Sequence, residues 1–255
     1  MRWFLISLAS ALVIVSASAQ EKAQPRPVSP EELLNAYLGK WEEHMAKVDA
    51  VQSNCVLIED DGTHKNRYVG KVAVLKPNFV RLALKAEDEL KNEKKWRFIL
   101  ADGVDVWEFD YRAKVARVRA LPKQGLNHPA LVLLLGGKAA DLQKRYEFSI
   151  DPARDQKDNN YVAIGIRPKA KEDQQDMVKA ELVLWKNDKN EKLKKSWLLP
   201  ARLWIQQPNQ DQITWNFLDP APANLTKADF AVPKLPVDWK TERHPVEATP
   251  AGRPK

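Results

Sequence analysis

Apolar residues recur every third or fourth position in the segment that follows Ser29. This spacing places them on one face of an α-helix and leaves charged residues on the opposite face. Ser29, Pro30 and Glu32 form the pattern of a capped helix start, in which the Glu32 side chain closes a capping box. The pattern predicts an amphipathic helix whose apolar face packs on another surface. The apolar positions are Leu33, Leu34, Tyr37, Leu38, Trp41 and Met45.

Beyond residue 48 the hydrophobic period shortens to two. Runs rich in β-branched and aromatic residues occupy most of 51–119 and again 161–218, with polar segments between them. Asp-Gly pairs at 61–62 and 102–103 are hairpin-turn signals between such runs. The pattern predicts two groups of antiparallel strands joined by hairpins.

The run from 104 to 111 carries large apolar residues on both of its faces. Val104 and Val106 lie on one face, and Trp107 and Phe109 lie on the other. We therefore expect apolar neighbours on both sides of this strand.

The ends of the chain differ from its middle. Residues 1–19 combine a basic start, an apolar run too short to span a bilayer and a small-residue cleavage pattern, so they are expected to form a signal peptide. Residues 20–28 are expected to form an extended leader. Residues 29–240 are expected to form a single domain, because the charged segments within them are no longer than ordinary connectors. Residues 241–255 lack apolar periodicity and are predicted to be a disordered tail.

An exported chain is expected to be periplasmic or secreted, and soluble after cleavage. Removal of Arg2 with the signal peptide lowers the formal charge from +7 to +6. Outside the cytosol a basic balance favours an anionic membrane surface or an acidic protein over nucleic acid, and simple solubility is the alternative. No nucleic-acid partner is therefore expected. Cys55 is the single cysteine, so no intramolecular disulfide can form, and its apolar strand neighbours predict a buried, inert thiol.

The sequence contains no recognisable catalytic motif. Phosphate-binding glycine loops, nucleophile elbows and zinc-protease signatures are all missing, and the 4 histidines are far apart. We expect a protein that is not an enzyme and that has no cofactor and no metal.

The run from Leu131 to Leu135 consists of five large aliphatic residues between a proline and a Gly-Gly pair. It is predicted to form a short helix, and a second short helix is expected to follow it. Because such a helix has no polar face, it needs cover on nearly all sides. It is either a core plug of a curved sheet or a lid over an apolar ligand held between helix and sheet.

The order of these elements resembles the LolA-type periplasmic lipoprotein carriers. The segments LKPNF, ILADGVDVWEFD, HPALVLLL and the closing ADFAVPKLPVDW carry the likeness, which extends from about Ser29 to Trp239. The resemblance implies an α+β fold. The implied fold is an incomplete, strongly curved antiparallel β-barrel, a half-barrel, with helices expected to lid the concave face and acyl chains expected to bind there.

The resemblance also implies a set of site residues. Lys76 occupies the position where the carriers have an arginine that hydrogen-bonds to the lid, and lysine keeps the charge but lacks the planar guanidinium. Lys76 is therefore the candidate lid latch. The expected cavity and lid residues are Leu131, Leu133, Leu134, Leu135, Phe79, Trp107, Phe109 and Trp215.

The leading functional hypothesis is non-enzymatic binding or carriage of a lipid, or of a lipoprotein acyl chain, in the periplasm. The alternative is a protein-interaction or envelope-sensing module on the same scaffold, with no lipid ligand. The expected partners are a lipid or an acylated protein. An envelope membrane complex or an anchored receptor is a further expected partner, and the chain itself is expected to be a monomer.

Overall fold

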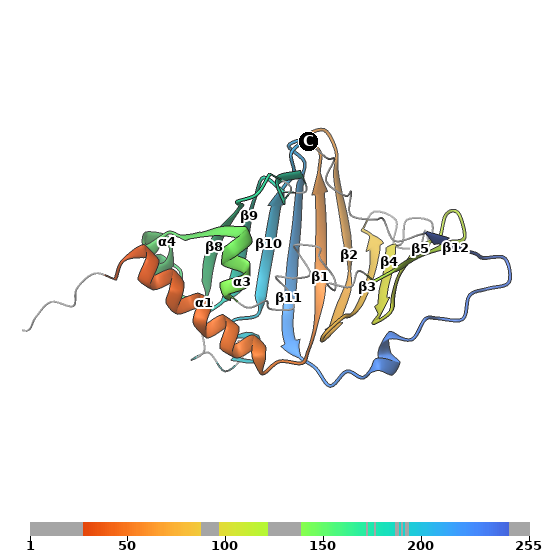
Figure 1. Ribbon diagram of the computed structural model, residues 1–255, viewed down its shortest axis with the longest axis horizontal. Helices are drawn as coiled ribbons and strands as arrows, with labels where there is room; N and C mark the ends of the chain where they lie inside the picture. The colour runs from red at the N-terminus through yellow and green to blue at the C-terminus, as the bar shows by residue number, and fades with distance from the viewer. Residues whose placement is uncertain are drawn as a thin grey trace, which may run out of the picture.

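The computed structural model describes residues 28–87, 97–121, 139–171, 173–175, 177–186, 189, 191 and 194–244. In these residues one open twelve-stranded sheet forms the body of the protein, and short helices accompany it (Figure 1). The predicted α+β half-barrel, with an open curved sheet, is confirmed. No helix within the described ranges is long and apolar enough to cross a membrane.

Helix α1 (Pro30–Ala46) begins where the sequence predicts. The Ser29 hydroxyl accepts a hydrogen bond from the Glu32 amide at 3.1 Å, and the Glu32 carboxylate accepts one from the Ser29 amide at 3.0 Å. This capping box satisfies two amides that have no partner inside the helix. The buried positions Leu34, Leu38, Trp41 and Met45 all belong to the predicted apolar face.

The strands follow the order β12-β6-β5-β4-β3-β2-β1-β11-β10-β9-β8-β7. Neighbouring strands are antiparallel except for β12, which runs parallel to β6. The strands are β1 (Ala50–Asp60), β2 (Lys65–Leu75), β3 (Phe79–Ala86), β4 (Arg97–Asp102), β5 (Asp105–Asp110), β6 (Val115–Ala120), β7 (Tyr146–Ile150), β8 (Tyr161–Pro168), β9 (Lys179–Trp185), β10 (Pro200–Gln206), β11 (Gln212–Pro222) and β12 (Lys240–His244).

Both Asp-Gly signals mark hairpins. Gly62 lies between β1 and β2 with a φ of 83°, and Gly103 lies between β4 and β5 with a φ of 90°. Glycine has no Cβ and adopts this left-handed region without strain, which explains its place in both turns. At Gly103 a Cβ would also meet the Phe79 ring at 2.6 Å, so this turn is closed against an aromatic side chain.

Several segments outside the predicted strand runs also form helix or strand. Helix α3 (Ala139–Arg145) is the second short helix that the sequence predicts. Helix α4 (Pro152–Lys157) forms in a charged segment that was expected to be a connector between strands. The disordered tail predicted from 241 onward is wrong for 241–244, because these residues pair with β6 as part of β12, and their side chains are all exposed.

Alternation along the strands divides the sheet into two faces with separate apolar clusters. We call the face on which α1 packs the α1 side; its cluster includes Val80 and Ala101 together with the buried residues of α1. We call the opposite face the tail side; its cluster includes Phe79, Leu100 and Phe230. The segment after β11 supplies Phe230 through a short 3-10 helix, η4 (Lys227–Phe230), on its way to β12 (Figure 1).

Candidate functional site

Five apolar side chains from strands β11, β1, β2, β3 and β5 lie on the α1 side of the sheet. Leu57 of β1 lies opposite Tyr68 of β2 and opposite Trp215 of β11 in the ladder register. Leu57 is only 3% exposed, whereas the other four are half-buried and pack against the main cluster. Half-buried rings and aliphatic chains leave apolar surface that a ligand can cover. We call this set the apolar wall: Leu57, Tyr68, Leu82, Val106 and Trp215.

Helices α1 and α3 lie toward the β7 end of the sheet. Helices α1 and α3 contact β7 and each other. Figure 1 shows β1 to β5 to the right of both helices, so the apolar wall is displaced from their main contacts. The wall therefore has more apolar surface than the described helices occupy.

A polar group closes one end of the wall. Arg97 of β4 donates to both Glu59 carboxylate oxygens at 2.6 and 2.9 Å and to the Tyr68 hydroxyl at 2.7 Å. Its guanidinium also lies 4.2 Å from the centre of the Tyr68 ring. Burial alone would lower the pKa of Arg97, but the bonds and charge of Glu59 outweigh it and raise the pKa. A fixed Arg97–Glu59 ion pair thus adjoins the apolar surface.

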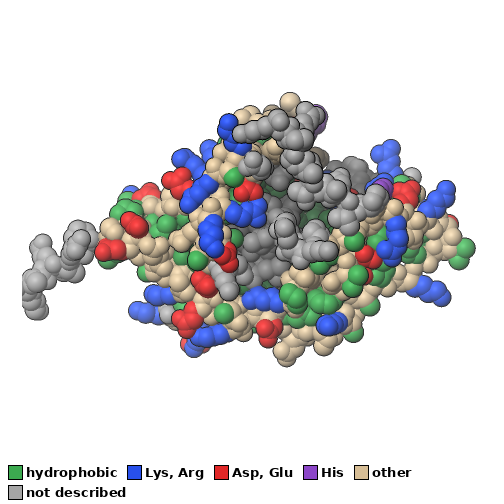
Figure 2. Space-filling model, viewed as in Figure 1, with side chains coloured by type: hydrophobic (Ala, Val, Ile, Leu, Met, Phe, Trp, Pro, Cys, Tyr) green, Lys and Arg blue, Asp and Glu red, His purple; other side chains and the backbone are tan. Residues whose placement is uncertain are grey.

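Ion pairs border the same face at the β5–β6 edge. Arg117 contacts Asp110 at 3.1 Å, and Arg119 contacts Glu108 at 3.2 Å. Over the face that Figure 2 shows, Lys and Arg side chains are interspersed with Asp and Glu. Mixed charge of this kind keeps a surface soluble and gives it no strong single-sign field.

Lys76, the candidate latch, lies in the turn between β2 and β3. Its Nζ donates a hydrogen bond to the Met45 carbonyl in the last turn of α1. Burial lowers the pKa of Lys76, and the nearby Asp49 charge opposes that change. The side chain therefore fastens the C-terminal end of α1 to the sheet, where a cation also interacts favourably with the helix dipole.

The predicted site residues do not all lie together. Trp215 is part of the apolar wall, but Phe79, Trp107 and Phe109 belong to the tail-side cluster. The expectation that these four share one concave surface is wrong, because Phe79 alternates with Val80 and the other two alternate with Val106. The predicted lid residues Leu131, Leu133, Leu134 and Leu135 lie outside the described residues.

The three displaced aromatics have structural partners on the tail side. The Phe79 and Phe230 rings lie 5.6 Å apart, and the Phe109 and Trp239 rings lie 6.3 Å apart. Trp107 Nε1 donates to an Asp102 carboxylate oxygen at 2.9 Å. The closing segment of the domain therefore covers Phe79 and Phe109. Val106 packs against one apolar cluster and Trp107 and Phe109 belong to the other, so the expectation of apolar neighbours on both faces of β5 is confirmed.

Sequence reasoning missed most of the apolar wall. Leu57, Tyr68, Leu82 and Val106 come from four different strands, and only the register between the strands brings them together. The sequence does show that Val106 and Trp107 alternate, which places them on opposite faces of the sheet. It does not show which of these two faces α1 covers.

Cys55 and His44 lie on the α1 side without an apparent chemical role. Cys55 is 1% exposed, and its burial is confirmed; desolvation raises the pKa of its thiol to about 12. The His44 ring packs edge-on against Trp197 at 5.2 Å, and desolvation, followed by the Lys47 charge, lowers the pKa of His44. Within the described ranges no three histidine, cysteine, aspartate or glutamate side chains gather as metal ligands would.

Comparison with known proteins gives structural matches only. No protein-family model and no curated protein sequence matches the chain. A conserved uncharacterised protein from Thermus thermophilus is 11% identical with a TM-score of 0.48, over 83% of this chain and 99% of that one. A LolA superfamily protein from Nitrosomonas europaea is 13% identical with a TM-score of 0.40, over 78% and 97%. LprF from Mycobacterium bovis is 11% identical with a TM-score of 0.40, over 78% and 97%. These likenesses concern the fold and assign neither ligand nor partner.

Proposed function

We propose that this protein binds the hydrocarbon part of a lipid, or of a lipoprotein acyl chain, against the apolar wall and carries it in the periplasm. The observation that carries the proposal is the row of half-buried apolar side chains from β11 to β5, displaced from the main contacts of α1 and α3. In this role the protein binds and transports its ligand and catalyses no reaction on it. The predicted lid at 131–135 is part of it, as the cover of the bound chain.

Hydrocarbon burial supplies the energy for such binding. Each methylene transferred from water contributes about 0.8 kcal/mol, so ten of them contribute roughly 8 kcal/mol before the cost of association. The wall supplies the complementary surface, because Trp215, Tyr68 and Leu82 present rings and branched carbons. Strand β1, which lies between Trp215 and Tyr68, presents the apolar Leu57 on the same face. The Arg97 group at the end of the wall suits the polar end of an amphiphile.

The first experiment is native mass spectrometry, with organic extraction, of protein purified from a periplasmic fraction. The second is titration of the delipidated wild type with a fluorescent fatty acid. Saturable binding and a co-purifying lipid are the expected results. Absence of both would contradict the proposal and leave the protein-interaction module as the better explanation.

Two tryptophan variants make the titration specific for the wall. Trp215→Ala removes apolar surface that contributes about 1 kcal/mol or more to the binding free energy. The affinity for the fatty acid should therefore fall roughly five- to tenfold. Trp239→Ala is the matched control, because Trp239 lies in the tail-side cluster. Equal loss of affinity in both variants would show that the effect is one of general stability.

A further inference from the structure

Two connecting segments meet at the β12 end of the sheet. Residues 111–114 join β5 to β6, and residues 231–239 run from η4 to β12. The Lys240 amide donates a hydrogen bond to the Lys114 carbonyl at 3.0 Å, so the two segments are in contact. Figure 1 shows the second segment at the margin of the molecule, at the opposite end from α4. We call residues 111–114 and 234–240 together the corner.

Inward-facing side chains fix the conformation of the corner. Leu235 and Trp239 pack against the tail-side cluster. The Trp239 ring lies 5.2 Å from the Tyr111 ring in an edge-on arrangement. The Trp239 amide donates to the Pro236 carbonyl at 3.0 Å and so closes a turn that contains Val237. The turn is therefore held by its neighbours and not by the Val237 side chain.

Apolar surface is exposed at the corner. Val237 is 106% exposed, whereas the other large apolar side chains that are exposed in the described ranges have values of 43–71%. Ala113 and Pro236 are exposed as well, and Tyr111 and Trp239 are only half-buried. Several apolar groups thus gather at one place on the surface, and Val237 makes no contact that would stabilise the fold. Such a group of side chains is available to a partner.

The corner also carries an excess of positive charge. Residues 110–117 and 234–243 contain six Lys or Arg and three Asp or Glu, which is an excess of three, compared with seven in the whole chain. Arg112, Lys234 and Lys240 are exposed, and none of them has an ion-pair partner among the residues that the structure describes. Figure 2 shows Lys and Arg side chains above and below the apolar atoms at the right-hand extreme of the molecule.

The carboxylates of this region are engaged within the protein. Asp238 contacts Lys114 at 2.5 Å, and the hydrogen bond from Lys114 lowers the pKa of Asp238. Arg117 contacts Asp110 at 3.1 Å and Glu242 at 4.0 Å. The charges of the corner that lack a partner in the described part of the chain are therefore all positive.

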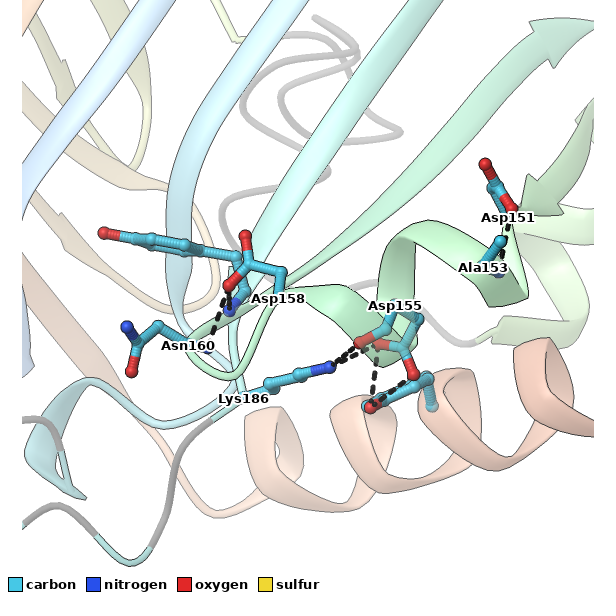
Figure 3. Close-up of polar contacts among 8 residues, drawn as sticks. Asp151, Ala153, Asp155, Asp158, Asn160 and Lys186 are labelled. Carbon is cyan, nitrogen blue, oxygen red and sulfur yellow. Dashed lines mark hydrogen bonds and ion pairs between the residues drawn. The ribbon is translucent and has the colours of Figure 1, made fainter.

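Cations at the α4 end of the sheet are paired internally. Lys186 donates a hydrogen bond to Asp155 at 2.8 Å (Figure 3). Arg154 and Arg202 contact the two oxygens of Glu181 at 2.6 and 2.5 Å. The fields of paired charges largely cancel at a distance. These three cations therefore attract an external anion less than the free cations of the corner do.

The combination of cations and apolar groups suits an anionic lipid bilayer. Anionic head groups attract Lys and Arg side chains, and Trp and Tyr side chains favour the boundary between head groups and hydrocarbon. An acidic protein would pair with the cations equally well. The exposed Val237 favours the bilayer, because hydrocarbon lies directly behind the phosphates there and can receive an apolar side chain.

We propose that the corner docks this protein on a bilayer that contains anionic phospholipid. Arg112, Lys234 and Lys240 contact the phosphates, and Val237 with Pro236 enters the head-group boundary. The corner contains no residue of the apolar wall. Docking therefore goes beyond the proposed carriage of lipid and does not depend on it.

The test is co-sedimentation of the full exported chain with large unilamellar vesicles of phosphatidylethanolamine and phosphatidylglycerol. Vesicles of phosphatidylcholine are the comparison, because they have hydrocarbon but no net charge. The partition coefficient should be at least about tenfold higher for the anionic vesicles, since three cations act together. Equal partition into both kinds of vesicle, or into neither, would overturn the proposal. Retention on polyglutamate beads without vesicle binding would assign the corner to an acidic protein instead.

Two double variants test whether the charges act at the corner. Lys234→Gln with Lys240→Gln should lower partition into anionic vesicles at least about tenfold. Lys157→Gln with Lys171→Gln is the matched control, because both residues are exposed and lie outside the corner. The control should bind as the wild type does. Equal losses in the two double variants would show that net charge alone drives binding, and would overturn the assignment to the corner.

A pair of valine variants tests insertion. Val237→Ser should lower partition roughly three- to fivefold. Val178→Ser is the matched control, since Val178 is 43% exposed and lies just before β9. The fatty-acid affinity of Val237→Ser should equal that of the wild type, so failure of docking and failure of lipid carriage appear in different measurements. A circular-dichroism melt of each variant checks folding. Unchanged partition of Val237→Ser would contradict insertion of this side chain.

Discussion

Phe79 and Val80 are consecutive residues of β3, yet their side chains belong to apolar clusters on opposite faces of the sheet. Val80 is buried in the cluster that contains α1, and Phe79 is buried against Phe230 of the closing segment. The sheet is thus covered on both sides in this region. Only the α1 side carries the half-buried wall that we assign to the ligand.

Phe79→Ala tests this division. Phe79 is 8% exposed, so its removal leaves a cavity and should lower the free energy of unfolding by about 3–5 kcal/mol. Fatty-acid affinity of the folded variant should not change, because the ring faces the tail side. Urea denaturation and a fatty-acid titration measure the two effects. A loss of affinity with little loss of stability would return Phe79 to the ligand site.

We expect the Lys76 side chain to stabilise the C-terminal end of α1. Lys76→Met removes a charged hydrogen bond to the Met45 carbonyl, which should lower the free energy of unfolding by about 1–2 kcal/mol. Lys76→Arg keeps a donor and should lose less. Urea denaturation of both variants provides the comparison. If Lys76→Met is as stable as the wild type, the contact does not fasten the helix.

Tyr37 makes the unfolding free energy of the protein depend on pH in the alkaline range. Burial, and then the Asp155 charge, raise the pKa of its hydroxyl to about 12 from an ordinary 10. The neutral hydroxyl is therefore favoured in the folded state, and its contribution is complete below pH 10 and is lost as the pH rises toward 12. Tyr37→Phe should flatten the fall in unfolding free energy over this window. Parallel curves for wild type and variant would show that Tyr37 does not contribute.

Leu133→Ala distinguishes a lid from a core plug. A lid belongs to the less stable part of a structure, so the change should cost under about 1.5 kcal/mol of global stability while altering fatty-acid affinity. A core residue would instead lose about 2–5 kcal/mol without a specific effect on binding. Urea denaturation and a ligand titration of this one variant separate the two.

Local signals in the sequence were sufficient for much of the fold. The capping box at Ser29, the apolar face through Trp41 and the Asp-Gly turns all act over a few residues, and each is found where it was predicted. Alternation likewise located the strands of the meander. Such features depend on propensity and on contacts close in sequence, which a single chain displays directly.

Long-range contacts account for what the sequence did not reveal. Helix α4 is polar, with no buried residue, and a bond from Tyr37 to Asp155 ties it to α1. Strand β12 is equally polar and pairs through its backbone with β6. Neither segment has an apolar period to detect. The assignment of Phe79 to a face also needed the partner segment around Phe230, which lies far along the chain.

The most direct measurement of the central claim is photo-crosslinking with a diazirine-bearing palmitic acid. Digestion and mass spectrometry then identify the labelled residues. We expect labels in peptides that contain Leu57, Leu82, Val106 or Trp215, and we expect excess palmitate to compete with the labelling. Labels confined to tail-side residues such as Phe79, or labelling that palmitate does not suppress, would contradict the assignment of the apolar wall as the lipid site.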